Sequence, residues 1–136
     1  MPNLIEVPLN KKNIELITKL PPPGIKVSLD ANLFRRVIDN LLSNAIKFTP
    51  ENSQIYFVAD YTSSGKFSIQ IADSGLCVKE ELREVIFAKY EVGNLITGAY
   101  QIGLGLAYCK MIVEAHGGYI KVEDNHPTGA IFIVEI

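Results

Sequence analysis

Hydrophobic and polar residues alternate along this chain with two different periods. A period of two, typical of half-buried strands, runs through 13–20, 25–29, 54–61, 66–72, 119–123 and 130–136. A period near 3.6 predicts helices over 30–48, 79–87 and 104–115. The order β-β-α-β-β-α-α-β-β predicts an α/β two-layer sandwich, in which one mixed sheet packs on about three helices.

Turn residues set the limits of these elements. Asp30 has the character of an N-cap for the first helix, and Pro50 stops that helix soon after its end. The Thr-Ser-Ser-Gly stretch at 62–65 joins two strands as a hairpin, and Gly117 ends the last helix. Residues 88–102 lack a clear period and predict a loop long enough to serve as a lid.

Composition narrows the possible classes of protein. A chain of 136 residues, 48% of them hydrophobic, predicts one folded domain over 1–136 and excludes a disordered chain. A net charge of −2 and a pI near 5.7 argue against a nucleic-acid surface. No apolar run is long enough to span a membrane, and no signal peptide is recognisable, so we expect no membrane contact by this domain.

Two cysteines and two histidines form no metal-ligand spacing. Cys109 lies inside an apolar helical run, where a small buried hydrophobic side chain is the simplest interpretation. The low cysteine count fits a reducing cytoplasm.

The first predicted helix carries an unusual polar cluster. At about 100° per residue, Asn40, Asn44 and Lys47 fall within an arc of roughly 60° beside the apolar stripe. An asparagine oxygen can bind a hard cation, and a lysine can bind phosphate, so a nucleotide is the candidate ligand. The alternative is the polar solvent face of an ordinary helix.

Two glycine-containing segments could complete such a site. Asp73-Ser74-Gly75 follows an apolar strand, although the same tripeptide is also a common turn. The segment Gly103-Leu104-Gly105-Leu106 precedes the last helix, where exposed backbone N–H groups and the helix dipole favour phosphate.

Taken in order, the segments 40–47, 73–75 and 103–106, with Phe87 between them, resemble the catalytic ATP-binding domain of bacterial sensor histidine kinases. The resemblance extends over about 13–136. The runs Asn-Leu-Leu-Ser-Asn-Ala-Ile-Lys-Phe-Thr-Pro and Ile-Val-Glu-Ala-His-Gly-Gly are similar to the kinase branch in particular. The wider superfamily includes gyrase, mismatch-repair ATPases and a heat-shock chaperone, and its fold is the Bergerat-type ATP-binding fold.

The resemblance implies a role for each polar residue of the helix. Asn44 would coordinate Mg²⁺ through its carboxamide oxygen, and Lys47 would bind phosphate oxygens. Asn40 would lie near the transferring phosphoryl group as the catalytic residue. ATP and Mg²⁺ are the implied cofactors.

The resemblance also assigns the glycine segments. Asp73 would accept a hydrogen bond from the adenine amino group, and Gly75 would let the backbone approach the base. The segment 103–106, with Gly103, Leu104, Gly105 and Leu106, would bind ATP at the start of the last helix. Phe87 would pack near the lid, although a plain core phenylalanine fits the sequence equally well.

Two positions depart from the family pattern. Cys77 stands where the first glycine box has a glycine, and Gln101 replaces the first glycine of the second box. A side chain where a glycine has φ > 0 or touches the ligand costs on the order of 1–2 kcal/mol. We therefore expect reduced but retained ATP binding.

The phosphoacceptor is the second gap. Sensor kinases phosphorylate a histidine on a separate dimerising helical domain, and neither His116 nor His126 has the surroundings of that residue. His116 lies at a helix end, where packing or the helix dipole explains it. The resemblance thus implies the cytoplasmic catalytic piece of a longer protein, which other domains can attach to the membrane, with a response regulator downstream.

Two other functions remain open at this point. Cys77 and Gln101 also fit a degenerate pseudokinase module that acts through protein contacts with weak or no ATP binding. A serine kinase that binds a sigma factor shares the fold and lacks an attached dimerising helix.

Overall fold

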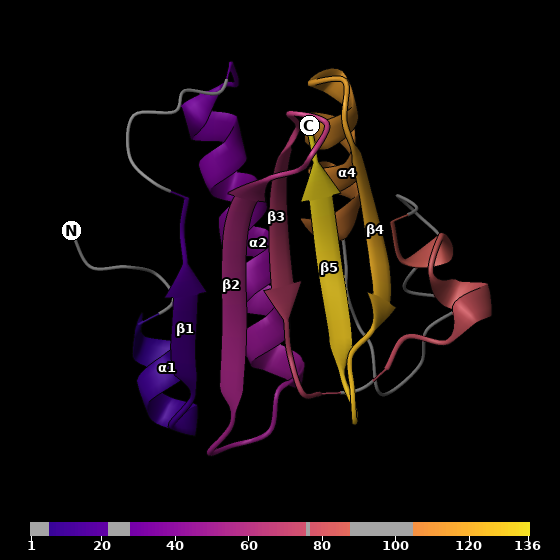
Figure 1. The fold of residues 1–136 in the computed structure, drawn as a ribbon. Helices are drawn as coiled ribbons and strands as arrows, with labels where there is room; N and C mark the ends of the chain where they lie inside the picture. Colours follow the sequence, from indigo (N-terminus) through magenta and orange to yellow (C-terminus); the bar gives the residue numbers. More distant parts are fainter. Residues whose placement is uncertain (1–5, 22–27, 76, 88–104) are drawn as a thin grey trace.

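The computed structural model describes residues 6–21, 28–75, 77–87 and 105–136. Five strands form one sheet, and α2 and α4 lie together behind it (Figure 1). The strands are β1 (Glu15–Lys19), β2 (Gln54–Tyr61), β3 (Phe67–Ala72), β4 (Tyr119–Asp124) and β5 (Ala130–Glu135). The α-helices are α1 (Glu6–Lys12), α2 (Ala31–Phe48) and α4 (Gly105–Ala115), and two short 3₁₀ helices are η1 (Glu80–Leu82) and η2 (Val85–Phe87).

The sheet has the order β1-β2-β3-β5-β4. β1 and β2 are parallel because α2 connects them, and the other three pairs are antiparallel. The predicted mixed sheet and two-layer α/β sandwich are therefore confirmed. As a consequence, the end of α2, the end of β3 and the β4–β5 turn meet at one end of the sheet (Figure 1).

Helix α2 forms as its sequence predicts. Asp30 is the N-cap, and its side chain accepts a hydrogen bond from the Leu33 N–H at 3.1 Å. Every third or fourth residue faces the sheet, and Val37, Leu41 and Ala45 are almost fully buried. Within the described ranges, no helix has both the length and the apolar character of a membrane span.

Three predicted elements need comment. The helix predicted over 79–87 is wrong, because the segment forms η1 and η2 with i→i−3 hydrogen bonds. Arg83 holds the bend between them, since it donates to the Val78 carbonyl and pairs with Asp124 at 2.9 Å. Residues 25–27 of the strand predicted over 25–29 and the predicted lid at 88–102 lie outside the described residues, while Ser28 and Leu29 form no strand.

Helix α1 was not predicted, and it contains a proline. Pro8 is its third residue, where the missing N–H would have had no partner within the helix in any case. At its other end, the Lys12 ammonium donates to the carbonyl oxygens of Ile46, Lys47 and Thr49 at 2.8, 3.0 and 3.1 Å. A cation on these carbonyls caps the C-terminal end of α2.

The turn between β4 and β5 packs on the segment that follows β3. The Asn125 side chain donates to the Asp73 carbonyl at 2.8 Å, and the Thr128 hydroxyl donates to the Gly75 carbonyl at 3.0 Å. Gly129 has φ +107°, and a Cβ there would lie 1.9 Å from the Asp73 carbonyl oxygen. Only glycine allows the two backbone segments to approach so closely.

We predict that Lys12→Met lowers the free energy of unfolding by about 2 kcal/mol, because three carbonyls at the end of α2 lose a charged donor. Urea denaturation followed by circular dichroism measures the change. Lys11→Met is the matched control, since Lys11 is an exposed neighbour. Equal stabilities of the two variants would contradict the capping role.

We predict that Gly129→Ala lowers the free energy of unfolding by about 3 kcal/mol, because the new methyl group meets the Asp73 backbone. Gly65→Ala is the control, since Gly65 also has positive φ, +84°, but faces open space. Its cost is backbone strain alone, about 1 kcal/mol. Thermal unfolding of both variants tests whether the close approach, rather than φ, limits position 129.

Candidate functional site

Asp73 is the most buried acidic residue in the described part of the chain, with 1% of its surface exposed. It follows the last residue of β3, and its N–H donates to the Ala130 carbonyl at 2.9 Å. Oδ1 accepts from the N–H groups of Gly75 at 2.9 Å and Ala130 at 3.2 Å. Oδ2 is buried and has no hydrogen-bond partner.

Only one of the two carboxylate oxygens of Asp73 accepts hydrogen bonds from the described residues. Burial raises the pKa of Asp73 above its ordinary value, and the two N–H donors on Oδ1 oppose that rise. Because the folded-state pKa is raised, this group stabilises the fold most at low pH, and the contribution is lost as the pH rises through that pKa. Because both N–H donors go to Oδ1, Oδ2 remains an acceptor for which the described residues supply no donor.

The turn after Asp73 rests on the end of α2. A Cβ added to Gly75 would lie 2.2 Å from the Phe48 carbonyl oxygen, so the close backbone approach expected of Gly75 occurs here, against α2. Thr49, which follows Phe48 in the chain, has 1% of its surface exposed, and its hydroxyl has no hydrogen-bond partner among the described residues. The end of α2 and the end of β3 thus bring two unsatisfied polar side chains to the same region.

The predicted polar residues of α2 all lie on one continuous helix. Asn40 is half-buried and faces the first turn of α4, since a Cβ on Gly105 would lie 3.7 Å from its Cγ and Oδ1. Asn44 is half-buried, and its buried Nδ2 has no partner. Lys47 is exposed, with Nζ 5.5 Å from the centre of the Phe48 ring. The structure therefore does not support a uniformly solvated polar face.

In the first turn of α4, only one of the two described residues that were predicted to bind ATP lies beside the polar residues of α2. Gly105 is the first helical residue and packs on Asn40, but Leu106 is almost fully buried and belongs to the core. Gly103 and Leu104 lie outside the described residues. Cys109, one turn later, is completely buried as predicted, and burial raises the pKa of its thiol to about 12.

Two further predicted positions have clear places. Phe87 is buried, and its ring meets Phe132 edge-on at 6.3 Å, so its described contacts are those of a core phenylalanine. Cys77 is exposed, which means that its thiol does not fill the interior beside Asp73. Gln101 lies outside the described residues.

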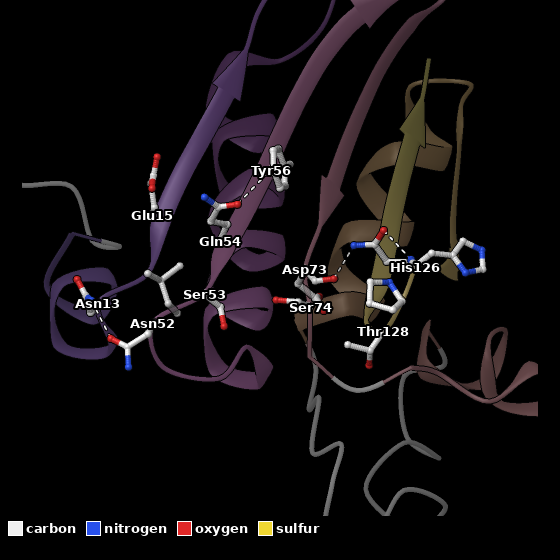
Figure 2. A pocket seen from close by; sticks show the side chains of 13 residues that line it. Asn13, Glu15, Asn52, Ser53, Gln54, Tyr56, Asp73, Ser74, His126 and Thr128 are labelled. Carbon is white, nitrogen blue, oxygen red and sulfur yellow. Dashed lines mark hydrogen bonds between the residues drawn. The ribbon is translucent and has the colours of Figure 1, made fainter.

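A cavity of about 680 Å³ opens at the same end of the sheet, and Figure 2 shows its lining. One wall comes from the start of β1 and β2, including Glu15 and Gln54, and the other contains Ser74, His126 and Thr128. Asp73 also lines it, whereas Asn40, Asn44 and Lys47 do not. This cavity is therefore distinct from the nucleotide site that the sequence predicts between α2 and the glycine-containing segments.

Sequence reasoning missed the residues that hold Asp73 in place. The sequence pattern predicts Thr128 and Gly129 only as part of a turn between the last two strands, and it assigns no role to Asn125 or Thr49. A cluster of Asn, Pro, Thr and Gly does predict a turn. Nothing in that local pattern shows that the turn packs on the backbone of Asp73 and Gly75, more than 50 residues away.

Comparisons with known proteins agree with this architecture. A family model described as "Histidine kinase-, DNA gyrase B-, and HSP90-like ATPase" matches residues 29–136. The chain is 39% identical over 123 residues to the sensor protein KdpD of Clostridium acetobutylicum, covering 89% of this chain and 14% of KdpD. It is 32% identical over 126 residues to the adaptive-response sensory kinase SasA of Prochlorococcus marinus, covering 92% of this chain and 34% of SasA.

Solved structures give the same result. The nucleotide-free catalytic domain of histidine kinase ThkA has a TM-score of 0.82 and 31% identity, covering 98% of this chain and 85% of that one. Full-length ShkA in complex with AMPPNP has a TM-score of 0.81 and 29% identity, covering 97% of this chain and 27% of that one. ThkA in complex with the response regulator protein TrrA has a TM-score of 0.80 and 32% identity, covering 98% and 36%.

The chain spans about a third or less of the length of these curated relatives. The family-model match over 29–136 includes β2 to β5, α2 and α4, and with them Asp73 and the polar residues of α2. The chain therefore belongs to the family of histidine kinase-, DNA gyrase B- and HSP90-like ATPases, and it is a histidine kinase catalytic domain within that family.

Proposed function

We propose that this domain binds ATP with Mg²⁺ and presents the γ-phosphoryl group to a histidine on a separate dimerising helical domain. The observation that carries the proposal is the buried Asp73 carboxylate, whose Oδ2 has no partner at the end of β3. An amino group is the donor that such an oxygen lacks, and adenine carries one whereas guanine has a carbonyl oxygen at that position. The fold of an ATPase family supports adenine as the base.

The donor set fits a magnesium ion that is held largely by its nucleotide. Among the described residues, no three His, Cys, Asp or Glu side chains gather as a metal site. Mg²⁺ commonly takes few protein oxygens, keeps several waters and binds phosphate oxygens. Asn44 is half-buried, and its amide nitrogen has no hydrogen-bond partner among the described residues, so nothing described there fixes its carboxamide. We propose that its carboxamide oxygen holds the ion and that Lys47 would neutralise phosphate charge.

Phosphoryl transfer would depend on positioning and charge neutralisation rather than on covalent chemistry by this domain. An imidazole nitrogen of the acceptor attacks the γ-phosphorus, the bond to the bridging oxygen breaks, and ADP leaves. Asn40 is proposed near the transferring group because it packs on Gly105 at the start of α4. There the backbone N–H groups of the first turn favour phosphate.

The contacts of His116 support a phosphoryl-accepting histidine that lies outside this chain. His116 is engaged at both ring nitrogens, since Nε2 accepts from the Asp30 N–H at 3.0 Å and Nδ1 lies 2.8 Å from the Ile112 carbonyl. ThkA is known in complex with its response regulator TrrA, and we propose a response regulator as the downstream partner here too. The proposal places the domain in the cytoplasm, where ATP is available.

We predict that the wild-type chain binds ATP with Mg²⁺ and that Asp73→Asn weakens binding by about 10- to 100-fold, because a charged acceptor for the amino group is lost. Asn44→Ala should remove most of the magnesium dependence of the affinity. Isothermal titration calorimetry with and without Mg²⁺ measures both effects. Asp60→Asn and Asn32→Ala are the controls, since both residues are exposed. No binding by any of these proteins at millimolar ATP would favour the degenerate module.

We predict that Asp73→Asn raises the free energy of unfolding at pH 7 by about 1 kcal/mol although it weakens ATP binding. The reason is that the variant no longer ionises in a buried position whose pKa is raised. Because Asp73 is protonated at low pH, the gain should grow as the pH rises from 4 to 7. Chemical denaturation across that range checks it. A variant that is less stable than the wild type at every pH would assign Asp73 a structural role.

A further inference from the structure

Thr49 is held in place by its backbone and leaves its side chain unused. Its N–H donates to the Ala45 carbonyl at 3.0 Å, and its carbonyl accepts from Lys12 Nζ at 3.1 Å. The residue is 1% exposed, yet Oγ1 has no hydrogen-bond partner. A buried hydroxyl without a partner lowers the stability of the fold, so its presence needs an explanation.

Thr49 and Asp73 lie on two segments that touch. A Cβ on Gly75 would lie 2.8 Å from the Phe48 carbonyl carbon, which is bonded to the Thr49 nitrogen, and 3.3 Å from Asp73 Oδ1. The Phe48–Thr49 peptide and the Asp73 carboxylate therefore flank the same point. Each of the two residues directly follows an element, is held by backbone hydrogen bonds, and carries one buried oxygen that has no partner among the described residues.

The two oxygens have complementary hydrogen-bonding roles. An ionised carboxylate can only accept, whereas a threonine hydroxyl can also donate. Adenine presents the matching pattern, an amino donor next to a ring-nitrogen acceptor, and guanine presents a carbonyl oxygen where adenine has the amino group. An acceptor and a donor on two touching segments thus match the hydrogen-bonding pattern of the adenine edge.

We propose that the Thr49 hydroxyl is a second base-recognition group, which donates to the adenine ring nitrogen beside the amino group, directly or through one water. This inference rests on the proposed function, because it assigns a further residue to the same nucleotide site. Thr49 acts on the base, whereas we have assigned the phosphates to Lys47 and the magnesium ion to Asn44.

Thr49→Val tests the proposal, because valine keeps the shape of threonine and removes only the hydroxyl. ATP affinity is measured by calorimetry with Mg²⁺, and stability is measured without nucleotide by thermal unfolding. We expect the affinity to fall by about 3- to 10-fold, the equivalent of one hydrogen bond, and by the same factor for ADP as for ATP. We also expect the melting temperature without nucleotide to rise, since a buried hydroxyl without a partner has been removed.

Thr49→Ser is the rescue variant, and it should bind ATP within about twofold of the wild type because it restores the donor. Thr18→Val is the matched control, since Thr18 is an exposed residue of β1. Unchanged ATP affinity of Thr49→Val would overturn the proposal. So would weaker binding together with a lower melting temperature, because the hydroxyl would then be structural. If the wild-type chain itself binds no ATP, the proposed function fails first and this assignment fails with it.

Discussion

The burial of Asp73 between two close backbone contacts is the constraint on which the site depends. On one side Gly75 lies against the Phe48 carbonyl, and on the other Gly129 lies against the carbonyl of Asp73 itself. Neither contact leaves room for a Cβ, so the carboxylate has a fixed position. Its Oδ1 is satisfied by two backbone N–H groups, and Oδ2 is left for a ligand. Fixed geometry with one unused acceptor is what recognition of a base requires.

This arrangement places polar groups where they do not favour the folded state. Buried side-chain atoms without partners in the described ranges are Asn44 Nδ2, Thr49 Oγ1, Asp73 Oδ2 and Tyr108 Oη. The first three lie in the last turn of α2 or directly after α2 and β3, and the family resemblance assigns Asn44 and Asp73 to the nucleotide site. Such atoms destabilise the fold unless a ligand or a water molecule supplies the missing hydrogen bond. Residues that are kept for binding commonly lower stability in this way. Their concentration at one end of the sheet separates the site from the apolar core.

The same end of the molecule is connected to the segment that precedes the family match. Residues 29–136 match the family model, whereas α1 and β1 come earlier in the chain. Lys12 of α1 nevertheless caps the last turn of α2 through three carbonyls, including that of Thr49. The helix that carries Asn40, Asn44 and Lys47 is therefore anchored at its site end by a residue outside the matched region. The cap fixes the backbone from which the proposed base-recognition hydroxyl projects.

Much of this was determined by the sequence alone: the two periods of hydrophobic residues, the Asp30 cap and the motif order were sufficient for the sheet, α2 and the family. They failed for 79–87, where Arg83 donates to the nearby Val78 carbonyl and pairs with the distant Asp124, and they could not show that Leu106 and Phe87 belong to the core. Only the tertiary structure brought Asn125 and Gly129 against Asp73, and within the described ranges it left the Thr49 hydroxyl without a partner. The physical reason is that periodicity and capping are local properties, whereas an unsatisfied buried atom is defined by everything that surrounds it.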